Sequence, residues 1–228
     1  MKQLSGNRRL YPSVVTYLGD WRQMVNDVGR LKLTDISLFL TGARFSERQQ
    51  LYVALEKTAV RNIPHIHVRS DMKETELDYL IKRYSTKAFT THFQYLKYFA
   101  KSKHKKILFI ENNDGPHRIK NLNTLASYGG ACIDLSHLEQ FRRRQPDYYT
   151  LTAKTVKRYK VGCNHLSAVV KNGKSRHYAT SYQELTYVAG IEKKYFSRYI
   201  CLELANSIPE QLIFCNKLTQ LLEKAWKK

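Results

Sequence analysis

The sequence predicts a compact α/β fold, a single (β/α)8 barrel of the TIM type that spans residues 1–228 as one domain. Short apolar segments alternate with amphipathic segments along the whole chain, which indicates parallel strands joined by crossover helices. Eight such strand–helix pairs favour a closed barrel over an open sheet. No linker, repeat or low-complexity segment interrupts them, and 228 residues suit one barrel.

Eight apolar segments of five or six residues are the predicted strands. Most are rich in β-branched and aromatic residues and are bounded by polar or turn-forming residues. Because a helical segment follows each of them, the strands are expected to run parallel. They are Ser13–Leu18, Ile36–Leu40, Ile63–Val68, Ala88–His92, Ile107–Glu111, Ala131–Leu135, Val161–His165 and Tyr199–Leu204.

The segments between the strands have helical patterns. No Gly-x-Gly-x-x-Gly loop follows the first strand and no Gly-Lys-Ser/Thr loop is present, which argues against nucleotide-binding sheets. The predicted helices are Trp21–Leu31, Ser46–Thr58, Lys73–Tyr84, Phe93–Lys101, Asn121–Ser127, Pro146–Tyr159, Thr180–Ala189 and Ile208–Trp226.

The chain carries a formal net charge of +20, from 39 Lys and Arg against 19 Asp and Glu. Such an excess attracts polyanions. We therefore expect nucleic acid, DNA in the first place, or a phosphorylated sugar as the partner. The alternative is a generally basic, well-solvated surface with no particular partner. Net charge influences which molecules associate with a protein, but it does not identify a reaction.

The cysteines and the hydropathy pattern predict a cytoplasmic, monomeric protein with no membrane partner. No apolar run reaches the roughly 18–20 residues of a membrane span, and the polar N-terminus does not read as a signal peptide. The four cysteines are widely spaced and three lie in predicted strands, so we expect reduced core residues. They are Cys132, Cys163, Cys201 and Cys215.

Side chains that bind metals gather at the ends of the predicted strands. Five of the eight histidines and three carboxylates end a strand or lie in the loop that follows it. In a barrel these ends meet at one face, so the side chains are expected to form one pocket. The set is His67, His92, Glu111, Asp134, His137, His165, His177 and Glu203.

The physical chemistry of such a pocket favours a metal. Glu111 and Glu203 end otherwise apolar strands, where an uncompensated charge is costly. Several buried carboxylates repel one another unless cations neutralise them. Imidazole with carboxylate suits Zn²⁺ or Mn²⁺ and suits Mg²⁺ alone poorly. A single strand-end histidine is more often structural, so the prediction depends on the whole set.

Three histidines remain. His65 lies on the same strand face as His67, so either could be the ligand, and the position nearer the strand end favours His67. His104 lies in the basic run Lys101–Lys106 and is expected to be solvated. His117 follows a turn, and we expect it to touch a substrate phosphate or nothing.

The ordered set resembles the xylose-isomerase-like barrel superfamily, which includes sugar isomerases and epimerases and the endonuclease IV class of apurinic/apyrimidinic-site nucleases. The resemblance covers essentially the whole chain. The shared metal core of that superfamily is Glu, Asp, His and Glu from four strands. It matches Glu111, Asp134, His165 and Glu203, and the Asp-x-x-His motif of the superfamily matches the segment from Asp134 to His137.

Two further features are similar to endonuclease IV. These enzymes add a histidine on each of two earlier strands, matched here by His67 and His92, so that Glu111 would bridge two metals. They also carry Asp-Arg-His after the seventh strand, where this sequence has Ser175-Arg176-His177. The resemblance thus implies one to three Zn²⁺ ions, with Mn²⁺ as the alternative. A third site at His137 and His177 would lack its carboxylate.

The first of three hypotheses is a metal-dependent phosphodiesterase that resembles endonuclease IV and acts on nucleic acid, at abasic or damaged sites in DNA. Glu111 and Glu203 would be its catalytic carboxylates. Three arginines near the strand ends would contact phosphates. These are Arg44, Arg69 and Arg176.

The second hypothesis is a sugar or sugar-phosphate isomerase or epimerase with one divalent metal, in which Glu111 and Glu203 act as acid and base. The third is a non-catalytic barrel that binds nucleic acid by charge and by stacking on tyrosines. More than one metal ion per chain favours the first hypothesis over the second. The stacking candidates are Tyr148, Tyr149 and Tyr178.

Overall fold

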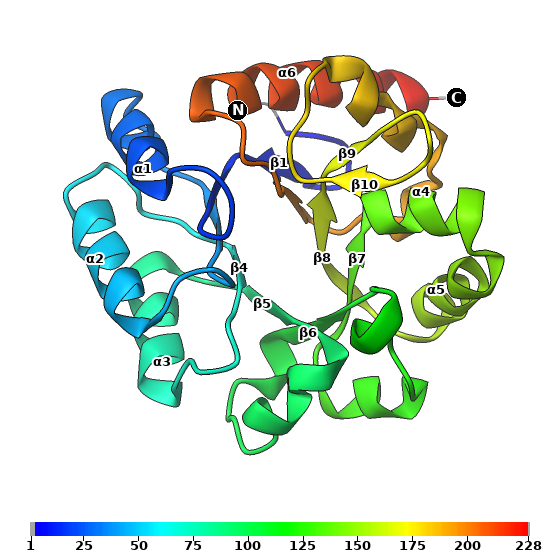
Figure 1. Ribbon diagram of the computed structural model, residues 1–228, viewed down its shortest axis with the longest axis horizontal. Coiled ribbons are helices and arrows are strands. Elements are labelled where there is room, and N and C mark those ends of the chain that lie inside the picture. Colours follow the sequence, from blue (N-terminus) through cyan, green and yellow to red (C-terminus); the bar gives the residue numbers. More distant parts are fainter. Residues whose placement is uncertain (1–2, 228) are drawn as a thin grey trace.

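Every strand of the main sheet is parallel to its neighbours, and the sheet curls into a nearly closed barrel (Figure 1). The computed structural model describes residues 3–227. The predicted α/β barrel is confirmed, with the strand order β1-β11-β8-β7-β6-β5-β4-β3-β2. The strands are β1 (Arg9–Tyr11), β2 (Ser13–Val15), β3 (Ser37–Phe39), β4 (His65–His67), β5 (Ala88–Thr91), β6 (Leu108–Glu111), β7 (Gly130–Asp134), β8 (Val161–Leu166) and β11 (Tyr199–Leu202).

The first strand of the barrel is divided at Pro12, which has no backbone N–H to donate. β1 pairs with β11 and β2 pairs with β3, so the two pieces belong to opposite sides of the seam. Gln211 of helix α6 (Ile208–Ala225) fills the break: its Oε1 accepts from the Ser13 amide at 2.8 Å and its Nε2 donates to the Ser13 carbonyl at 3.0 Å. The predicted strand Ser13–Leu18 therefore covers only the second piece.

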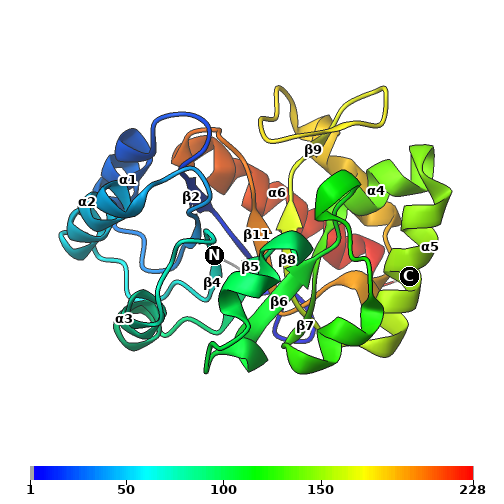
Figure 2. The same cartoon turned by 60° about the horizontal axis from the view of Figure 1, so that its bottom comes forward.

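Helices surround the barrel on its outside. Figure 1 and Figure 2 show α1 (Trp21–Arg30), α2 (Phe45–Glu56) and α3 (Glu74–Tyr84) on one flank, and α4 (Leu135–Arg144) and α5 (Pro146–Arg158) on the other. Three predicted helices are instead 3₁₀ segments. These are η1 (Phe93–Phe99), η4 (Leu122–Ser127) and η5 (Tyr182–Gly190); the other 3₁₀ turns are η2 (Lys105–Ile107), η3 (Gly115–His117) and η6 (Lys193–Tyr195).

The sequence analysis missed helix α4. The Asp134 carboxylate accepts hydrogen bonds from the amides of Ser136 and His137, at 2.7 and 2.9 Å, and so caps a helix where the predicted strand Ala131–Leu135 was still extended. Strand β7 therefore ends at Asp134 and α4 begins at Leu135.

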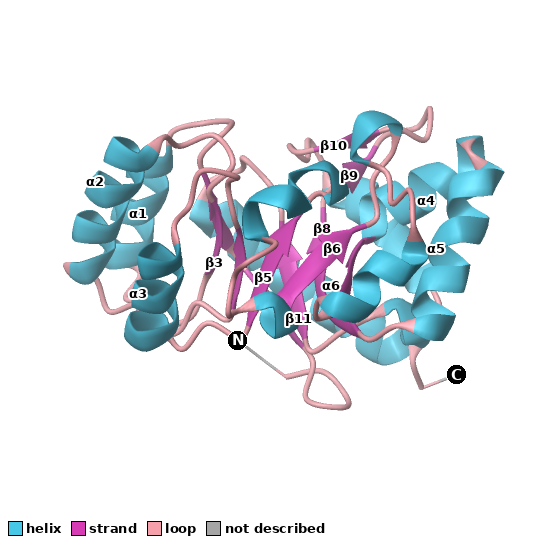
Figure 3. Cartoon of the chain, turned by 90° about the horizontal axis from the view of Figure 1, so that it is seen from below, coloured by secondary structure: helices cyan, strands magenta, loops and turns pink. Residues whose placement is uncertain are grey.

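A hairpin that was not predicted lies over the carboxyl ends of the strands. Its strands β9 (Ala168–Val169) and β10 (Ser175–Arg176) are antiparallel and turn through Gly173, which has a φ of 80°. Figure 3 shows the hairpin beyond the arrowheads of the barrel strands. It therefore covers part of the end of the barrel where the predicted metal ligands lie.

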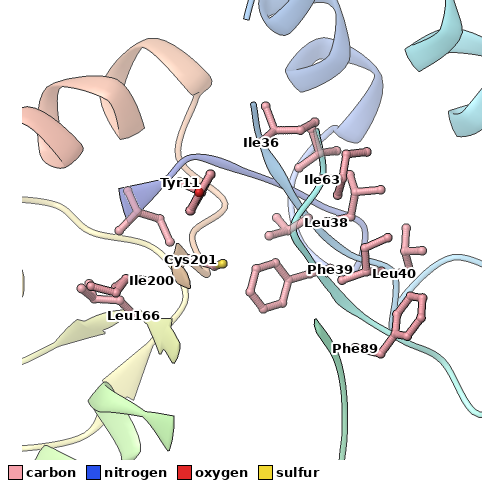
Figure 4. Close-up of a cluster of buried hydrophobic side chains, with 14 of the residues drawn as sticks. Tyr11, Ile36, Leu38, Phe39, Leu40, Ile63, Phe89, Leu166, Ile200 and Cys201 are labelled. Carbon is pink, nitrogen blue, oxygen red and sulfur yellow. The ribbon is translucent and has the colours of Figure 1, made fainter. Parts of the chain in front are cut away.

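The inner face of the barrel changes from apolar to polar along the strands. Ala88, Phe109, Cys132 and Cys163 form a small apolar cluster near the strand starts. Above it, the Phe39 ring packs against imidazole rings of the next layer, and Figure 4 shows it pointing toward the interior where β11 lies. The outward-facing side chains of the strands form the main core with the helices.

Two predictions about environment can be compared with the structure. All four cysteines are buried, three of them in strands β7, β8 and β11, which confirms that they are core residues. Among residues 3–227, no helix combines the length and the apolar character that a membrane crossing needs.

Gly162 makes room for the Phe109 ring, and this contact predicts a specific loss of stability. The register of β7 and β8 shifts beside Gly162, and a Cβ atom there would overlap the ring. We expect Gly162→Ala to lower the free energy of unfolding by about 1–3 kcal/mol, measured by urea denaturation. Gly190→Ala is the control, because a Cβ at Gly190 meets nothing within 4 Å.

The ring itself supplies the second half of this test. In a double-mutant cycle, Phe109→Leu should offset part of the cost of Gly162→Ala, because the smaller side chain leaves space for the added methyl group. Equal effects of the two alanine substitutions, or additivity in the cycle, would contradict the contact.

Candidate metal centre

The predicted metal ligands meet at the carboxyl end of the barrel. Parallel strands end at the same face, and alternate residues point inward. His67, Glu111 and Asp134 are the last residues of β4, β6 and β7. His92 and Glu203 directly follow β5 and β11, and His165 is the last residue but one of β8. The sequence therefore places six potential ligands from six strands around one space.

Glu111 lies at the centre of this arrangement and is 3% exposed. Its Oε2 atom is 3.0 Å from His67 Nε2, 3.3 Å from His92 Nε2 and 3.4 Å from His165 Nδ1. Its Oε1 atom accepts a hydrogen bond from Asn113 Nδ2 at 3.3 Å. One carboxylate oxygen thus faces three imidazole rings.

Two groups of three residues could each hold a metal ion, and Glu111 belongs to both. The first group is His67, His92 and Glu111; the second is Glu111, Asp134 and His165. Within each group the ligand atoms lie within 4.8 Å of one another. The two groups thus contain five of the six residues that the sequence analysis assigned to two metals, with Glu111 in both.

Asp134 presents a single free oxygen to the centre. Its Oδ1 atom accepts from the amides of Ser136 and His137 and from the Ser136 hydroxyl, the last at 2.6 Å. Its Oδ2 atom is buried without a hydrogen-bond partner. Asn112 holds the backbone of Asp134 from both sides, at 2.6 and 3.2 Å. The carboxylate is therefore fixed with Oδ2 free to act as a ligand.

Buried polar atoms without partners are concentrated around this centre. Native interiors leave few such atoms, so a cluster of them needs an explanation. Within residues 3–227, six of the twelve buried side-chain N and O atoms without a hydrogen-bond partner belong to the histidines and the aspartate around the centre. They are the Nδ1 atoms of His65, His92, His117, His137 and His165 and Oδ2 of Asp134. An imidazole and carboxylate donor set with free lone pairs fits a divalent transition metal.

Glu203 stands beside the second group and not inside it. Its Oε2 atom is 3.5 Å from His165 Nδ1 and 3.9 Å from His177 Nδ1. Its Oε1 atom accepts a hydrogen bond from the Tyr17 hydroxyl at 2.9 Å. The fourth residue of the predicted metal core is thus held next to His165 by a tyrosine that the sequence analysis did not single out.

The two glutamates of the centre have pKa values shifted in opposite directions. Burial would raise the pKa of Glu111, but the imidazoles of His165 and His92 hold it well below its usual range. Burial raises the pKa of Glu203, and His177 and His165 only partly offset this. Burial lowers the pKa of His165, but the two carboxylates outweigh it and raise that pKa to about 10. Two carboxylates whose pKa values are shifted apart in this way can take different roles in proton transfer.

His137 and His177 lie at the edge of the centre. His137 Nε2 is 3.9 Å from Asp134 Oδ2, and His177 Nδ1 is 3.1 Å from Ser167 Oγ. The potential metal groups among residues 3–227 do not include either histidine. Ser175, which stands where the resemblance implied a carboxylate, lies in β10 and its amide donates to Gln140.

Of the three arginines assigned to phosphate binding, Arg69 lies beside the ligands. It lines a cavity of about 280 Å³ together with His67 and His92, and its Nε atom is 3.2 Å from Asp71 Oδ1. Arg176 Nη2 is 2.9 Å from both carboxylate oxygens of Glu184. Arg44 is exposed at the start of α2 and does not line this cavity.

Two histidines left open by the sequence analysis belong to the same region. The His117 ring lies 4.5 Å from the His92 ring, and His117 lines the cavity beside Arg69. His65 faces inward as expected, but it lies below the ligands and contacts His165. By contrast, His104 is not fully solvated: its Nε2 atom is 2.7 Å from Asp78 Oδ1.

Comparisons with known proteins bear on the fold. No protein-family model matches the chain, and no curated protein matches it. The crystal structure of an uncharacterized protein from Parabacteroides distasonis ATCC 8503 is similar, with a TM-score of 0.50 and 14% sequence identity. The match covers 93% of this chain and 100% of that one. At this identity the likeness supports the barrel architecture alone.

The shared position of Glu111 predicts how metal content responds to substitution. Glu111→Gln should reduce binding at both groups, because it removes the only carboxylate they have in common. Asp134→Asn should weaken only the second group. Metal per chain after reconstitution, from elemental analysis and calorimetric titration, measures both effects. Glu139→Gln is the control, because Glu139 pairs with Arg142 and Arg143 on α4. An unchanged metal content in Glu111→Gln would rule out the shared ligand.

His65 is expected to fix which nitrogen of His165 faces the metal site. The Nε2 atoms of the two rings are 3.1 Å apart, so one proton must lie between them, and His65 Nε2 is also 2.9 Å from Thr90 Oγ1. Burial lowers the pKa of His65 to about 4 and keeps its ring neutral, so His165 can donate from Nε2 and offer Nδ1.

Replacement of His65 tests this role. His65→Leu should weaken metal binding at the second group by about 10–100-fold, because supporting hydrogen bonds orient ligand imidazoles. Nitrogen NMR spectra of the histidines should also show mixed tautomers of His165 in this variant. His104→Leu is the control, because His104 precedes the start of β6, at the opposite end of that strand from Glu111, and pairs with Asp78. If both the tautomer and the affinity stay unchanged, His65 has no such role.

Proposed function

We propose that the protein is a divalent-metal-dependent phosphodiester hydrolase that acts on nucleic acid, with abasic or damaged DNA sites as its substrate. One observation carries this proposal: Glu111 belongs to both groups of potential ligands. Paired metals that share a carboxylate suit phosphodiester hydrolysis, because both the attacking and the leaving oxygen need stabilisation. The resemblance to endonuclease IV in the order of the ligands also supports it. Zn²⁺ is the proposed metal, with Mn²⁺ as the alternative.

The chain's own residues would divide the work as follows. His67 and His92 would hold one ion and Asp134 and His165 the other, with Glu111 between them. Bound divalent ions supply Lewis acidity and lower the pKa of water toward neutrality. Asp134 is oriented by its three hydrogen bonds to Oδ1, so only Oδ2 faces the ion.

Glu203 is the proposed proton carrier. Of the two glutamates, Glu203 has the raised pKa and so holds a proton more readily than Glu111, and the Tyr17 hydroxyl fixes its Oε1 atom. The other oxygen, Oε2, faces the second group. A proton could therefore be delivered from Oε2 to the departing oxygen of the substrate.

The cavity beside the first group is the proposed phosphate site. Arg69 and His117 line it next to His67 and His92, and its volume of about 280 Å³ can hold a phosphate with part of a sugar. An arginine there can donate two hydrogen bonds to one phosphate. Its ion pair with Asp71, which is 44% exposed, would have to loosen on binding.

A sugar or sugar-phosphate isomerase or epimerase is the second candidate. The observation that favours it is the pair of glutamates with pKa values shifted apart, because isomerisation needs one group that gives a proton and one that takes it. One divalent ion at Asp134 and His165 would suffice for that chemistry. The first group of ligands and the basic charge have no role in it.

An incision assay tests the primary proposal. The zinc-reconstituted protein should cut a DNA duplex that carries one abasic site, and a chelator should abolish the activity until Zn²⁺ is restored. Glu111→Gln should lower kcat/KM on the order of 10³-fold or more, because both ions depend on that carboxylate. Glu139→Gln should cut at the wild-type rate.

The same preparations separate the two candidates. Two ions per chain with no cleavage of abasic, single-stranded or intact nucleic acid would rule out the hydrolase. One ion per chain together with interconversion of sugar phosphates would establish the isomerase instead.

A further inference from the structure

Cations, most of them exposed, gather at the end of the barrel opposite the candidate metal centre. All barrel strands begin at that end, which lies below the strand arrows in Figure 3, away from the β9–β10 hairpin. Cations stand at or just before the starts of β1, β4, β5, β6, β8 and β11. We call this surface the N-terminal face; its cations are Arg8, Arg9, Arg61, Lys87, Lys105, Lys106, Lys160 and Arg198.

The charges of the N-terminal face are largely not neutralised. Arg61, Lys87 and Arg198 are exposed, and within residues 3–227 no carboxylate forms a salt bridge with them or with the lysines of this face. Arg9 is the exception, with Nη1 at 3.3 Å from Asp35 Oδ1.

Several arginines at the carboxyl end of the barrel, which we call the metal end, are neutralised by carboxylates. Arg69 pairs with Asp71, Arg142 and Arg143 pair with Glu139, and Arg176 pairs with Glu184. These four guanidinium groups are therefore neutralised, whereas most cations of the N-terminal face are not.

A hollow on the N-terminal face can seat an anion. It has a volume of about 390 Å³ and is lined by Gln3, Asn7, Arg9, Tyr11 and Arg198. The Nε atom of Arg9 is buried without a hydrogen-bond partner. Arg198 brings a second guanidinium to the same hollow and has no carboxylate partner among the described residues. Two guanidinium groups around one hollow match the geometry of a phosphate.

We propose that the N-terminal face is a second nucleic-acid-binding surface, separate from the metal centre, that binds the phosphate backbone without regard to sequence. Arg9 and Arg198 seat one backbone phosphate in the hollow, and the surrounding lysines and Arg61 neutralise its neighbours. Contacts of this kind release counterions from the polymer, which supplies most of the free energy of non-specific binding. The surface does not depend on the proposed hydrolase activity.

The distribution of apolar side chains favours nucleic acid over a membrane. Peripheral membrane binding generally combines basic residues with an apolar anchor. The large apolar side chains that are exposed among residues 3–227 lie elsewhere: Leu18 follows β2, Phe45 begins α2 and Tyr178 follows β10, all toward the metal end. The others are on helices or 3₁₀ segments at the sides, at Val53, Tyr98 and Ile213. Among residues 3–227, no exposed aromatic side chain of this face offers base stacking, so contact with the nucleic-acid backbone is the mode that remains.

Two charge-matched triple variants test the surface. The first is Arg61→Gln with Lys87→Gln and Lys106→Gln; the second is Lys97→Gln with Lys154→Gln and Lys217→Gln, on η1, α5 and α6 at the sides of the barrel. All six residues are exposed and each variant loses three positive charges. Binding of a lesion-free duplex is followed by fluorescence anisotropy over a range of salt concentrations, with a chelator present so that the metal centre is silent.

In the first variant, the plot of the logarithm of the binding constant against the logarithm of the salt concentration should become less steep by about 2–3. Each lost phosphate contact removes about 0.9 from the magnitude of this slope. The second variant should leave the slope within about 0.5 of wild type. Arg198→Gln alone should reduce the slope by about 1. Glu111→Gln should bind as wild type does, which separates this surface from the proposed catalytic function. Thermal unfolding of each variant checks that the fold is intact.

Three results would overturn the proposal. Equal slope changes in the two triple variants would show that charge acts without a defined surface. A wild-type protein that does not bind the duplex would exclude this partner. Loss of binding to phosphatidylserine vesicles in the first variant, with duplex binding unchanged, would make the face a membrane contact instead.

Discussion

A carboxylate that ends a buried strand must have its charge compensated, and the compensation of Glu111 organises the open end of this barrel. The side chain is 3% exposed, and desolvation alone would favour its neutral form. Three imidazoles around Oε2 reverse that preference. Each imidazole comes from a different strand or strand end, so compensation requires that β4, β5 and β8 end level with β6. The parallel register of the barrel supplies this alignment.

The same constraint explains the polar layer beneath the ligands. His165 faces Glu111 with Nδ1 and His65 with Nε2, so the two imidazoles and Thr90 form a hydrogen-bonded chain inside the barrel. Such a chain couples the tautomers of the two imidazoles and limits the rotamers that His165 can adopt. Apolar residues at these positions would pack as well but would leave Nε2 of His165 without a partner.

Much of the barrel and its ligand set could be predicted from the sequence, because strand–helix alternation and strand-end position are local patterns. Glu111 and Asp134 end their strands as expected. The division of the first strand could not be predicted, since the side chain that bonds Ser13 at the break, Gln211, is almost 200 residues away in the sequence. The start of α4 had a usable signal, the Asp134 cap, but its apolar neighbours favoured a strand. Ion pairs such as Arg176 with Glu184 depend on rotamers and loop paths that no local pattern encodes.

The total charge predicted association with a polyanion but could not say which surface carries it. Unpaired cations beside the ligands would weaken the binding of a divalent ion, and Arg69, the arginine that lines the cavity with His67 and His92, is paired with Asp71. Strand β8, of six residues, rises about 20 Å, whereas charges in physiological salt are screened over about 8 Å. Exposed cations at the strand starts therefore act on the ligands at the strand ends more weakly than cations beside those ligands would. The barrel can in this way hold a polyanion at one end and cations at the other, with little electrostatic conflict between them.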